Sequence, residues 1–438
     1  MSTSGQQTPT IKSRRSSFNS REPLTRRLQP VNTGSIKVLL LEGISQKAVS
    51  IIESAGYQIE TIARSLSEQE LIEKIKDVHA IGIRSKTKLT KAVLEHAEKL
   101  IVIGCFCIGT NQVDLDFATE KGIAVFNSPF SNSRSVAELV IAEIIALSRK
   151  LGDNIKETSQ GIWNKAAKNC HEIRGKVLGI IGYGHIGTQL SVIAESLGMR
   201  VIWYDVLPVM PLGTSRSVDS LNSLLEISDF VSIHVPETPD TINMIKEAQI
   251  SRMKKGAMLI NASRGTVVDI PALANALNSG HLGGAAVDVF PVEPFKNGKF
   301  FESELIGCPN TILTPHIGGS TEEAQSMIGV EVSNAVVNFI NLGTSSNAVN
   351  FPECDLKALP ITDIKTLRIV NIHQNVPGVL LQINSIIGKY NVTKQVSDSR
   401  GDVAYFMADI TLDDSEAIDR IYKDIIGMSE NIMTRVLF

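Results

Sequence analysis

The sequence predicts an α/β protein with two doubly wound parallel sheets and a third, smaller βαββαβ module. Three observations support this prediction. Short apolar runs alternate with helical segments from residue 36 onward, a glycine-rich turn joins one such run to a helix at 182–187, and the order of segments changes beyond residue 366. With 438 residues, the chain is long enough for two to three domains.

Composition narrows the class of protein. Hydrophobic residues make up 43% of the chain and charged residues 20%, which is ordinary for a globular protein. The formal net charge of −3 does not indicate the basic surface that is typical of nucleic-acid-binding proteins. No apolar run reaches membrane-spanning length. The 5 cysteines form no metal-ligand pattern and suit a reducing compartment, so we expect a cytoplasmic protein.

The first regular unit is expected at residues 36–130. Residues 1–35 precede it and are rich in Ser, Thr, Pro and Arg, which predicts a disordered tail. From residue 36, strands alternate with helices, which predicts a parallel sheet covered by helices. The expected strands are 37–41, 58–62, 80–83, 100–103 and 123–126, and the expected helices are 47–55 and 67–75.

A long helix is expected after the first unit. Ser135 and Glu138 have the spacing of a capping box, which predicts that the helix begins there and continues to about Lys150. The helix is apolar nearly all round, so we expect it to be buried between two domains or two subunits.

A dinucleotide-binding motif follows the expected strand 177–181. Gly182, Gly184 and Gly187 have the G-x-G-x-x-G spacing, which provides a tight turn, close approach to a pyrophosphate and close helix packing. The phosphates would lie at the N-terminus of the next helix. A second strand, 200–204, ends in Asp205, which suits ribose hydroxyls and repels a 2′-phosphate, so NAD is favoured over NADP. A purely structural turn is the alternative, but strand, glycines, helix and acid together argue against it.

This NAD-binding Rossmann domain is expected to occupy residues 131–307. Its further strands are expected at 230–234, 257–261 and 285–290, and its further helices near 221–225 and at 271–279. A strand at 311–313 and a helix at 322–342 follow. We expect 308–342 to pack back onto 36–130, which would make the substrate-binding domain discontinuous.

Three polar residues follow strands of this region: Arg264, Glu293 and His316. Oxidation of a secondary alcohol by NAD needs a base for the hydroxyl proton, and histidine has a pKa near the operating pH. A carboxylate paired with the histidine would orient it and raise its pKa. Arginine offers a planar fork for a substrate carboxylate. Because a single loop histidine is more often structural, the hypothesis depends on the shared location of the three residues.

The C-terminal region is expected to form a separate ferredoxin-like domain. Residues 343–365 have the composition of a linker, and 366–438 form the module itself. Its strands are expected at 367–373, 391–397, 403–410 and 432–438, and its helices at 377–388 and 414–427.

Several motifs resemble the D-2-hydroxyacid dehydrogenase family. They are the segments 182–187, 261–265, 288–294 and 314–320, which agree with the family in order and spacing. The resemblance covers about 36–438 and is closest to the bacterial and fungal branch that oxidises 3-phospho-D-glycerate and carries a C-terminal ACT domain.

The resemblance implies a role for each residue of the site. Arg264 would bind the substrate carboxylate, His316 would be the acid/base, and Glu293 would be its partner. Backbone N–H groups at Ile108 and Gly109 would help to hold the carboxylate. The implied NAD contacts are Gly182, Gly184, His185, Ile186, Gly187, Asp205, His234, Val235, Pro236, Ala262, Ser263, Arg264, Asp288, His316, Gly318 and Gly319.

Recognition of the phosphate is implied for the loop after strand 80–83. Arg84, Ser85 and Lys86 match the stretch that supplies cations for it in the family, whereas the structural alternative is a solvated loop of mixed charge. Arg134 and Lys165 are weaker candidates that would reach a neighbouring subunit.

The resemblance also implies a serine-binding ACT domain. His373 and Asn375 match the ligand loop, but Thr393 stands where the bacterial pattern has asparagine. A purely structural dimerisation module is the alternative.

The expected reaction is therefore the NAD-dependent oxidation of 3-phospho-D-glycerate to 3-phosphooxypyruvate, the first step of phosphorylated L-serine biosynthesis. Reduction of 2-oxoglutarate to 2-hydroxyglutarate is an expected side activity, and a homotetramer is the expected assembly. Two alternatives remain open: a dehydrogenase for a smaller acid such as glycerate or lactate, and an NAD-sensing scaffold of the corepressor type.

Overall fold

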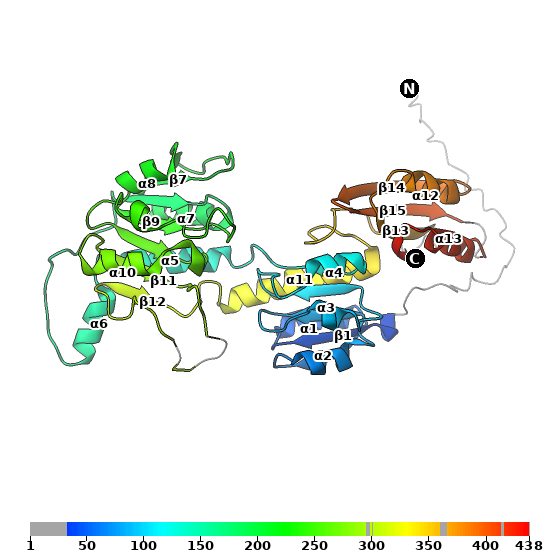
Figure 1. The fold of residues 1–438 in the computed structure, drawn as a ribbon, viewed down its shortest axis with the longest axis horizontal. Coiled ribbons are helices and arrows are strands. Elements are labelled where there is room, and N and C mark those ends of the chain that lie inside the picture. Colours follow the sequence, from blue (N-terminus) through cyan, green and yellow to red (C-terminus); the bar gives the residue numbers. More distant parts are fainter. Residues whose placement is uncertain (1–32, 295–297, 300, 360–365, 413–415, 438) are drawn as a thin grey trace, which may run out of the picture. The chain divides into compact units, whose positions relative to one another are not determined.

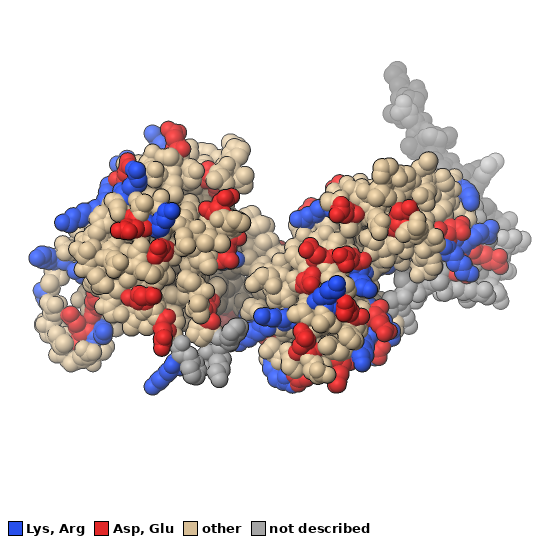
Figure 2. All heavy atoms as spheres, viewed as in Figure 1, with Lys and Arg blue, Asp and Glu red and all other residues tan. Residues whose placement is uncertain are grey.

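The computed structural model describes residues 33–294, 298–299, 301–359, 366–412 and 416–437. Residues 1–32 of the expected tail lie outside these ranges, whereas Thr33–Ser35 forms a 3-10 turn instead of the expected disorder. Two compact units are present: 33–340 with 347–350, and 341–346 with the described residues from 351 onward. In the view of Figure 2, acidic and basic side chains are interspersed, as expected for a net charge near zero.

The first sheet is parallel, with strand order β2-β1-β3-β4-β5. Figure 1 labels its strand β1 and the helices around the sheet. The strands are β1 (Lys37–Leu41), β2 (Gln58–Ile62), β3 (Ala80–Ile83), β4 (Val102–Cys105) and β5 (Ala124–Phe126). Apolar residues of α2 (Glu68–Ile75), α3 (Lys91–Leu94) and α4 (Leu115–Glu120) pack on one face. On the other face lies α11 (Glu322–Leu342), which contacts α1 (Gln46–Ser54) where Ser333 Oγ donates to the Ala48 carbonyl. The parallel, helix-covered arrangement is as predicted.

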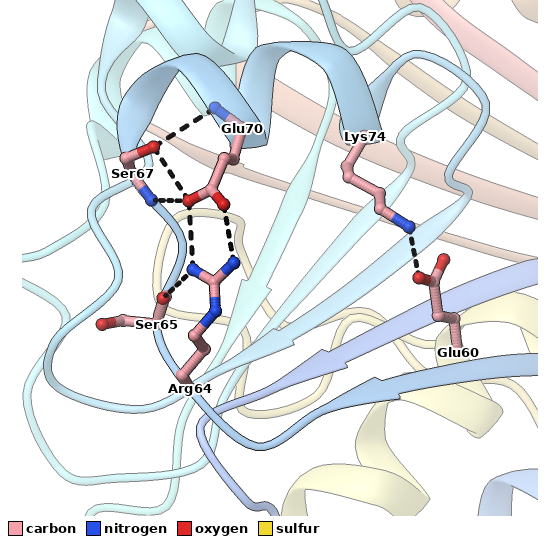
Figure 3. A network of polar contacts seen from close by, with 6 residues as sticks. All are labelled: Glu60, Arg64, Ser65, Ser67, Glu70 and Lys74. Atoms are coloured by element: carbon pink, nitrogen blue, oxygen red, sulfur yellow. Dashed lines mark hydrogen bonds and ion pairs between the residues drawn. The ribbon is translucent and has the colours of Figure 1, made fainter.

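The start of α2 shows how side chains fix one edge of this sheet (Figure 3). Ser67 and Glu70 form a capping box, in which each side chain accepts a hydrogen bond from the other's backbone N–H. The Arg64 guanidinium donates two hydrogen bonds to the Glu70 carboxylate. These hydrogen bonds lower the pKa of Glu70 to about 2, and those from Arg64 have the largest effect. Along the same helix, Lys74 pairs with Glu60 of β2. The segment before α2 is therefore held by a local polar network.

The second sheet has seven parallel strands in the order β12-β11-β10-β9-β6-β7-β8. The strands are β6 (Val177–Ile181), β7 (Arg200–Tyr204), β8 (Arg216–Ser217), β9 (Phe230–Ile233), β10 (Met258–Asn261), β11 (Gly284–Val287) and β12 (Thr311–Leu313). Helices α5 (Ser133–Ser148) and α7 (His185–Ser196) cover one face. Helices α8 (Leu221–Ile227), α9 (Glu247–Ile250) and α10 (Ile270–Asn278) cover the other. No helix in the described ranges is both long and apolar enough to cross a membrane.

Several details differ from the sequence-based expectations. The prediction of a capping box at Ser135 is wrong, because α5 begins at Ser133. The Ser135 hydroxyl lies 2.8 Å from that of Thr321. A separate helix, α6 (Leu151–Ser159), follows α5 and was not expected. The expected domain boundary at 308 places strand 311–313 in the first domain, but β12 pairs with β11 of the second sheet.

The C-terminal unit is an antiparallel sheet with the order β14-β15-β13-β16. Its elements follow the expected βαββαβ sequence: β13 (Thr366–Gln374), α12 (Val379–Ile387), β14 (Asn391–Arg400), β15 (Val403–Thr411), α13 (Glu416–Ile426) and β16 (Asn431–Leu437). Residues 347–350 of the expected linker belong to the first unit instead. The Val349 N–H donates there to the Val125 carbonyl beside the first sheet.

A buried ion pair crosses this antiparallel sheet. The Arg368 guanidinium donates to both carboxylate oxygens of Asp409, at 2.7 and 3.0 Å, and each side chain is only 1% exposed. The remaining N–H groups of Arg368 donate to the carbonyls of Leu342, Leu356 and Lys357. The arginine is therefore fully satisfied only while Asp409 is present.

We expect Asp409→Ala to destabilise the C-terminal unit by about 3–5 kcal/mol, because it leaves a buried positive charge unpaired. Lys394→Ala is the matched control, since its ammonium lies 3.9 Å from Asp409 Oδ2 but its side chain is 46% exposed. That substitution should cost at most about 1 kcal/mol. Denaturant unfolding of the full chain measures both, and equal losses would contradict the prediction.

Candidate active site

The glycine-rich turn after β6 has the geometry of a phosphate-binding loop. Gly182 has φ 90°, and a Cβ there would lie 2.5 Å from the His234 carbonyl oxygen. A Cβ on Gly187 would lie 2.3 Å from the Gly182 oxygen, so both positions require glycine. Gly184 has open space around it and caps α7 without a side chain. The N–H groups at the start of α7 are therefore available to an anion.

Asp205 lies directly after β7, beside this turn. Its Oδ2 accepts a hydrogen bond from the Tyr183 N–H at 2.7 Å, and its Oδ1 accepts one from the Leu207 N–H at 2.9 Å. The two bonds fix the carboxylate at the carboxyl end of the strand. Because each oxygen can accept further bonds, the carboxylate suits a pair of ribose hydroxyls.

Other expected cofactor residues line the same end of the sheet. The His185 ring stacks on Phe130 with centroids 3.5 Å apart, while Ile186 packs against the core beside α5. The His234 Nε2 lies 2.8 Å from the Ser232 hydroxyl, and burial lowers the pKa of this histidine to about 3. It is therefore neutral at physiological pH. Val235, Pro236, Ala262 and Ser263 follow β9 and β10 directly, and Ala262 and Ser263 are buried.

Asp288 organises the loop after β12. Its Oδ1 accepts hydrogen bonds from the Thr314 hydroxyl at 2.6 Å and the Ile317 N–H at 2.8 Å. Its Oδ2 accepts one from the Gly318 N–H at 2.8 Å, and its carbonyl accepts one from the His316 N–H. The next residue, Gly319, lies against Asn132 at the start of α5. The loop from 314 to 319 is thus attached to β11 and α5.

His316 and Glu293 form a hydrogen-bonded pair. His316 Nδ1 lies 2.8 Å from Glu293 Oε2, and the other carboxylate oxygen accepts a bond from the Phe290 N–H. Since a carboxylate only accepts hydrogen bonds, Nδ1 carries the proton and Nε2 is left as a base. The hydrogen bond to Glu293 raises the pKa of His316, against the opposing effect of burial. Burial alone would raise the pKa of Glu293, but the bonds from His316 and Phe290 lower it.

Arg264 lies close enough to affect both members of this pair. Its positive charge contributes to the lowered pKa of Glu293 and opposes the rise in the pKa of His316. Its guanidinium donates to the Ser263 carbonyl at 2.7 Å. A cavity of about 490 Å³ lies beside the pair, lined by His316, Glu293 and mainly apolar residues. The structure therefore brings together the three residues that the sequence singled out.

The candidate substrate loops follow strands of the first sheet. Arg84 is half-buried after β3, and Ser85 and Lys86 are exposed. In the loop after β4, the carbonyls of Ile108 and Gly109 accept bonds from Asn127 and Gln112, whereas their N–H groups have no acceptor among the described residues.

Two residues that the sequence did not single out contact these loops. The carboxylate of Glu42 accepts hydrogen bonds from the N–H groups of the loop after β3. The amide of Gln112 reaches the carbonyls of both Arg84 and Gly109. The partners of Glu42, and Arg84 as a partner of Gln112, lie 28 or more residues away in the sequence, so no local motif could identify these contacts.

The two weaker candidates for the phosphate lie in other surroundings. Arg134 pairs with Glu138 on α5, and Lys165 is exposed. Among the described residues, no group of three or more His, Cys, Asp or Glu side chains is arranged to hold a metal ion.

The expected effector residues are divided between the two ends of the C-terminal sheet. His373 Nδ1 lies 2.9 Å from the Asn371 amide oxygen, and Asn375 donates to the Gly401 carbonyl. Thr393 instead donates to the Asp409 carbonyl. In the β13–β15 register His373 pairs with Ala404 and Arg368 with Asp409, so these positions are about 17 Å apart along the strand. One chain alone does not bring the three residues into one site.

The comparisons with known proteins agree with this geometry. A family model described as the NAD binding domain of D-isomer specific 2-hydroxyacid dehydrogenase matches residues 141–318. D-3-phosphoglycerate dehydrogenase 1 of Saccharomyces cerevisiae is 58% identical over 94% of this chain and 89% of its own length. D-3-phosphoglycerate dehydrogenase of Escherichia coli is 50% identical over 92% of this chain and 98% of its own length.

Solved structures of other dehydrogenases share the fold over 72% of this chain. D-2-hydroxyisocaproate dehydrogenase aligns with a TM-score of 0.66 and 27% identity, over 72% of this chain and 100% of that chain. D-lactate dehydrogenase of Aquifex aeolicus, solved with NAD and lactic acid, aligns with a TM-score of 0.61 and 29% identity over the same shares. The glycine loop and Asp205 fit NAD as the cofactor. The chain therefore belongs to the D-isomer specific 2-hydroxyacid dehydrogenase family, and within it to the D-3-phosphoglycerate dehydrogenases.

Proposed function

We propose that the chain oxidises 3-phospho-D-glycerate to 3-phosphooxypyruvate with NAD, as the first step of phosphorylated L-serine biosynthesis. The observation that carries this proposal is the His316–Glu293 pair, with Arg264 beside it, at the carboxyl ends of strands that also carry the NAD loop. Relatives at 50–58% identity carry the name of this activity.

In this assignment, Arg264, His316 and Glu293 have different roles. Arg264 binds the substrate carboxylate and aligns the carbon that bears the hydroxyl group. His316 Nε2 accepts the hydroxyl proton, and Glu293 keeps the proton on Nδ1 and stabilises the imidazolium that forms. The N–H groups of Ile108 and Gly109 provide a second contact for the carboxylate.

NAD supplies the hydride acceptor when bound. The residues that hold it in this proposal are the N–H groups at His185 and Ile186 for the pyrophosphate and Asp205 for the ribose. His234, Val235 and Pro236 line the adenine side. Ala262, Ser263, Asp288, Gly318 and Gly319 lie toward the nicotinamide.

Arg84, Ser85 and Lys86 are proposed to bind the phosphate. Two cations and a hydroxyl on one loop suit a phosphate that carries about two negative charges. A distal carboxylate would also be accepted, which supports reduction of 2-oxoglutarate as a side activity. A dehydrogenase for glycerate or lactate would have no use for this loop.

We expect the purified chain to form NADH from NAD with 3-phospho-D-glycerate far better than with D-glycerate, once product removal drives the reaction. Arg84→Ala should raise KM for the phosphorylated substrate by about tenfold or more, because a charge-assisted hydrogen bond is lost. KM for D-glycerate should stay nearly unchanged. Lys88→Ala, an equal change of charge at an exposed residue nearby, is the control. Equal effects on both substrates would contradict the phosphate assignment.

The Glu293–His316 bond predicts a shift in pH dependence. Oxidation needs neutral His316, so kcat/KM should rise with pH through its raised pKa. In Glu293→Gln, the carboxylate no longer raises that pKa, and the rising limb should move to lower pH. Reduction needs the protonated form, so its falling limb should move in the same direction. If the rising limb of kcat/KM lies at the same pH in Glu293→Gln as in the wild type, Glu293 does not influence the titration of His316.

His316→Ala provides the reference for that profile. It should lower kcat by about 10²–10⁴-fold and abolish the limb. NAD binding, measured by quenching of protein fluorescence, should persist.

The C-terminal unit is proposed to be an ACT domain that binds L-serine. Its βαββαβ order supports this proposal, and so does the polar cluster of His373, Asn371, Asn431 and Thr434. Because Thr393 lies at the other end of the sheet, a site with all three expected residues requires a second chain. A structural dimerisation module remains the alternative.

We expect L-serine to inhibit the oxidation. Asn375→Ala should raise the half-inhibitory serine concentration by about tenfold, because one or two hydrogen bonds to the ligand are lost. Activity measured across a serine series tests this. Activity that does not respond to serine would leave the enzyme proposal intact and favour the dimerisation module.

A homotetramer in the cytoplasm completes the proposal. Exposed apolar side chains around α6, namely Leu151, Ile155, Ile162 and Trp163, are suited to contacts between subunits. The cysteines are all free, which suits a reducing compartment. The corepressor-type scaffold would instead bind NAD and protein partners without turnover, and the NADH assay separates it from the enzyme.

A further inference from the structure

The carboxylate of Glu42 holds the loop that follows β3. Its Oε1 accepts hydrogen bonds from the Arg84 N–H at 3.1 Å and the Thr87 N–H at 2.8 Å, and its Oε2 accepts one from the Lys86 N–H at 3.0 Å. Three of the four N–H groups from 84 to 87 therefore converge on one side chain. The Gln112 amide holds the same loop from the other side by donating to the Arg84 carbonyl.

The backbone of Glu42 is itself held in an unusual conformation. Its φ is 63°, in the left-handed region, which a residue other than glycine adopts only when its surroundings compensate. Its N–H donates to the carbonyl of Arg64, whose side chain is bound to Glu70 at the start of α2 (Figure 3). Glu42 therefore connects the capped start of α2 to the loop with Arg84 and Lys86.

We propose that Glu42 is a positioning residue for phosphate recognition, acting through the backbone of the Arg84–Lys86 loop. This inference rests on the proposed phosphate site. Charge and position predict opposite effects here. A carboxylate beside Arg84 and Lys86 lowers the positive potential that a phosphate meets, so by Coulomb attraction alone its removal would strengthen binding. If Glu42 sets the conformation of the loop, its removal weakens binding.

Glu42→Gln should raise KM for 3-phospho-D-glycerate by about tenfold, with KM for D-glycerate and kcat within about twofold of wild type. Glu42→Asp keeps the charge but withdraws the carboxylate by one methylene, and should also raise KM for the phosphorylated substrate. An unchanged or lower KM in either variant would overturn the proposal. If Glu42→Gln does not fold, Glu42→Asp tests the proposal in its place.

Hydrogen exchange on the full-length protein provides a readout that does not depend on activity. Peptides that span residues 84–87 should exchange faster in Glu42→Gln, and unchanged protection would also overturn the proposal. The control is Glu60→Gln, which makes the same change of charge at β2, where Glu60 pairs with Lys74. If Arg84→Ala fails to separate the two substrates, the phosphate site itself is wrong. If Arg84→Ala separates them and Glu42→Gln does not, only the role of Glu42 fails.

Discussion

The geometry of the candidate active site depends on the buried carboxylate of Asp288. This side chain is 1% exposed and accepts bonds from Thr314, Ile317 and Gly318. His316, between them, has φ 53°, and its N–H donates to the Asp288 carbonyl. The left-handed region is uncommon for residues other than glycine, and the hydrogen bonds to Asp288 stabilise it at His316. The direction in which the imidazole faces Glu293 is therefore set by a residue 28 positions earlier in the chain.

The same arrangement occurs at three strand ends. Glu42 follows β1, Asp205 follows β7 and Asp288 follows β11, and each carboxylate accepts backbone N–H groups from a loop. Hydrogen bonds to a charged acceptor are about twice as strong as neutral ones, so a single side chain can hold a loop that has no regular structure. Because parallel strands present their carboxyl ends at the same side of a sheet, each of these loops lies where ligands bind to its own sheet: the first sheet for Glu42 and the second for Asp205 and Asp288.

The local part of this design can be predicted from the sequence, and the long-range part cannot. The strand before the glycine loop was predicted at 177–181 and is β6, because its apolar run and the glycine spacing are contiguous signals. The capping box at Ser135 was wrong because its hydroxyl meets Thr321, which no local pattern indicates. Glu42 was missed for the same reason, since its partners lie 42 to 45 residues away. The meeting of Arg264, Glu293 and His316 could be predicted because each lies within six residues after the end of a strand of the second sheet.

The charges around His316 have a consequence for the proposed reaction. Glu293 raises the pKa of His316, whereas the positive charge of Arg264 opposes that rise. In the proposed assignment, the substrate carboxylate pairs with Arg264 and neutralises much of this opposing charge. This pairing would remove one interaction that lowers the pKa of His316, which favours transfer of the hydroxyl proton to Nε2. The substrate carboxylate, by pairing with Arg264, thereby offsets a charge that otherwise makes His316 a weaker base.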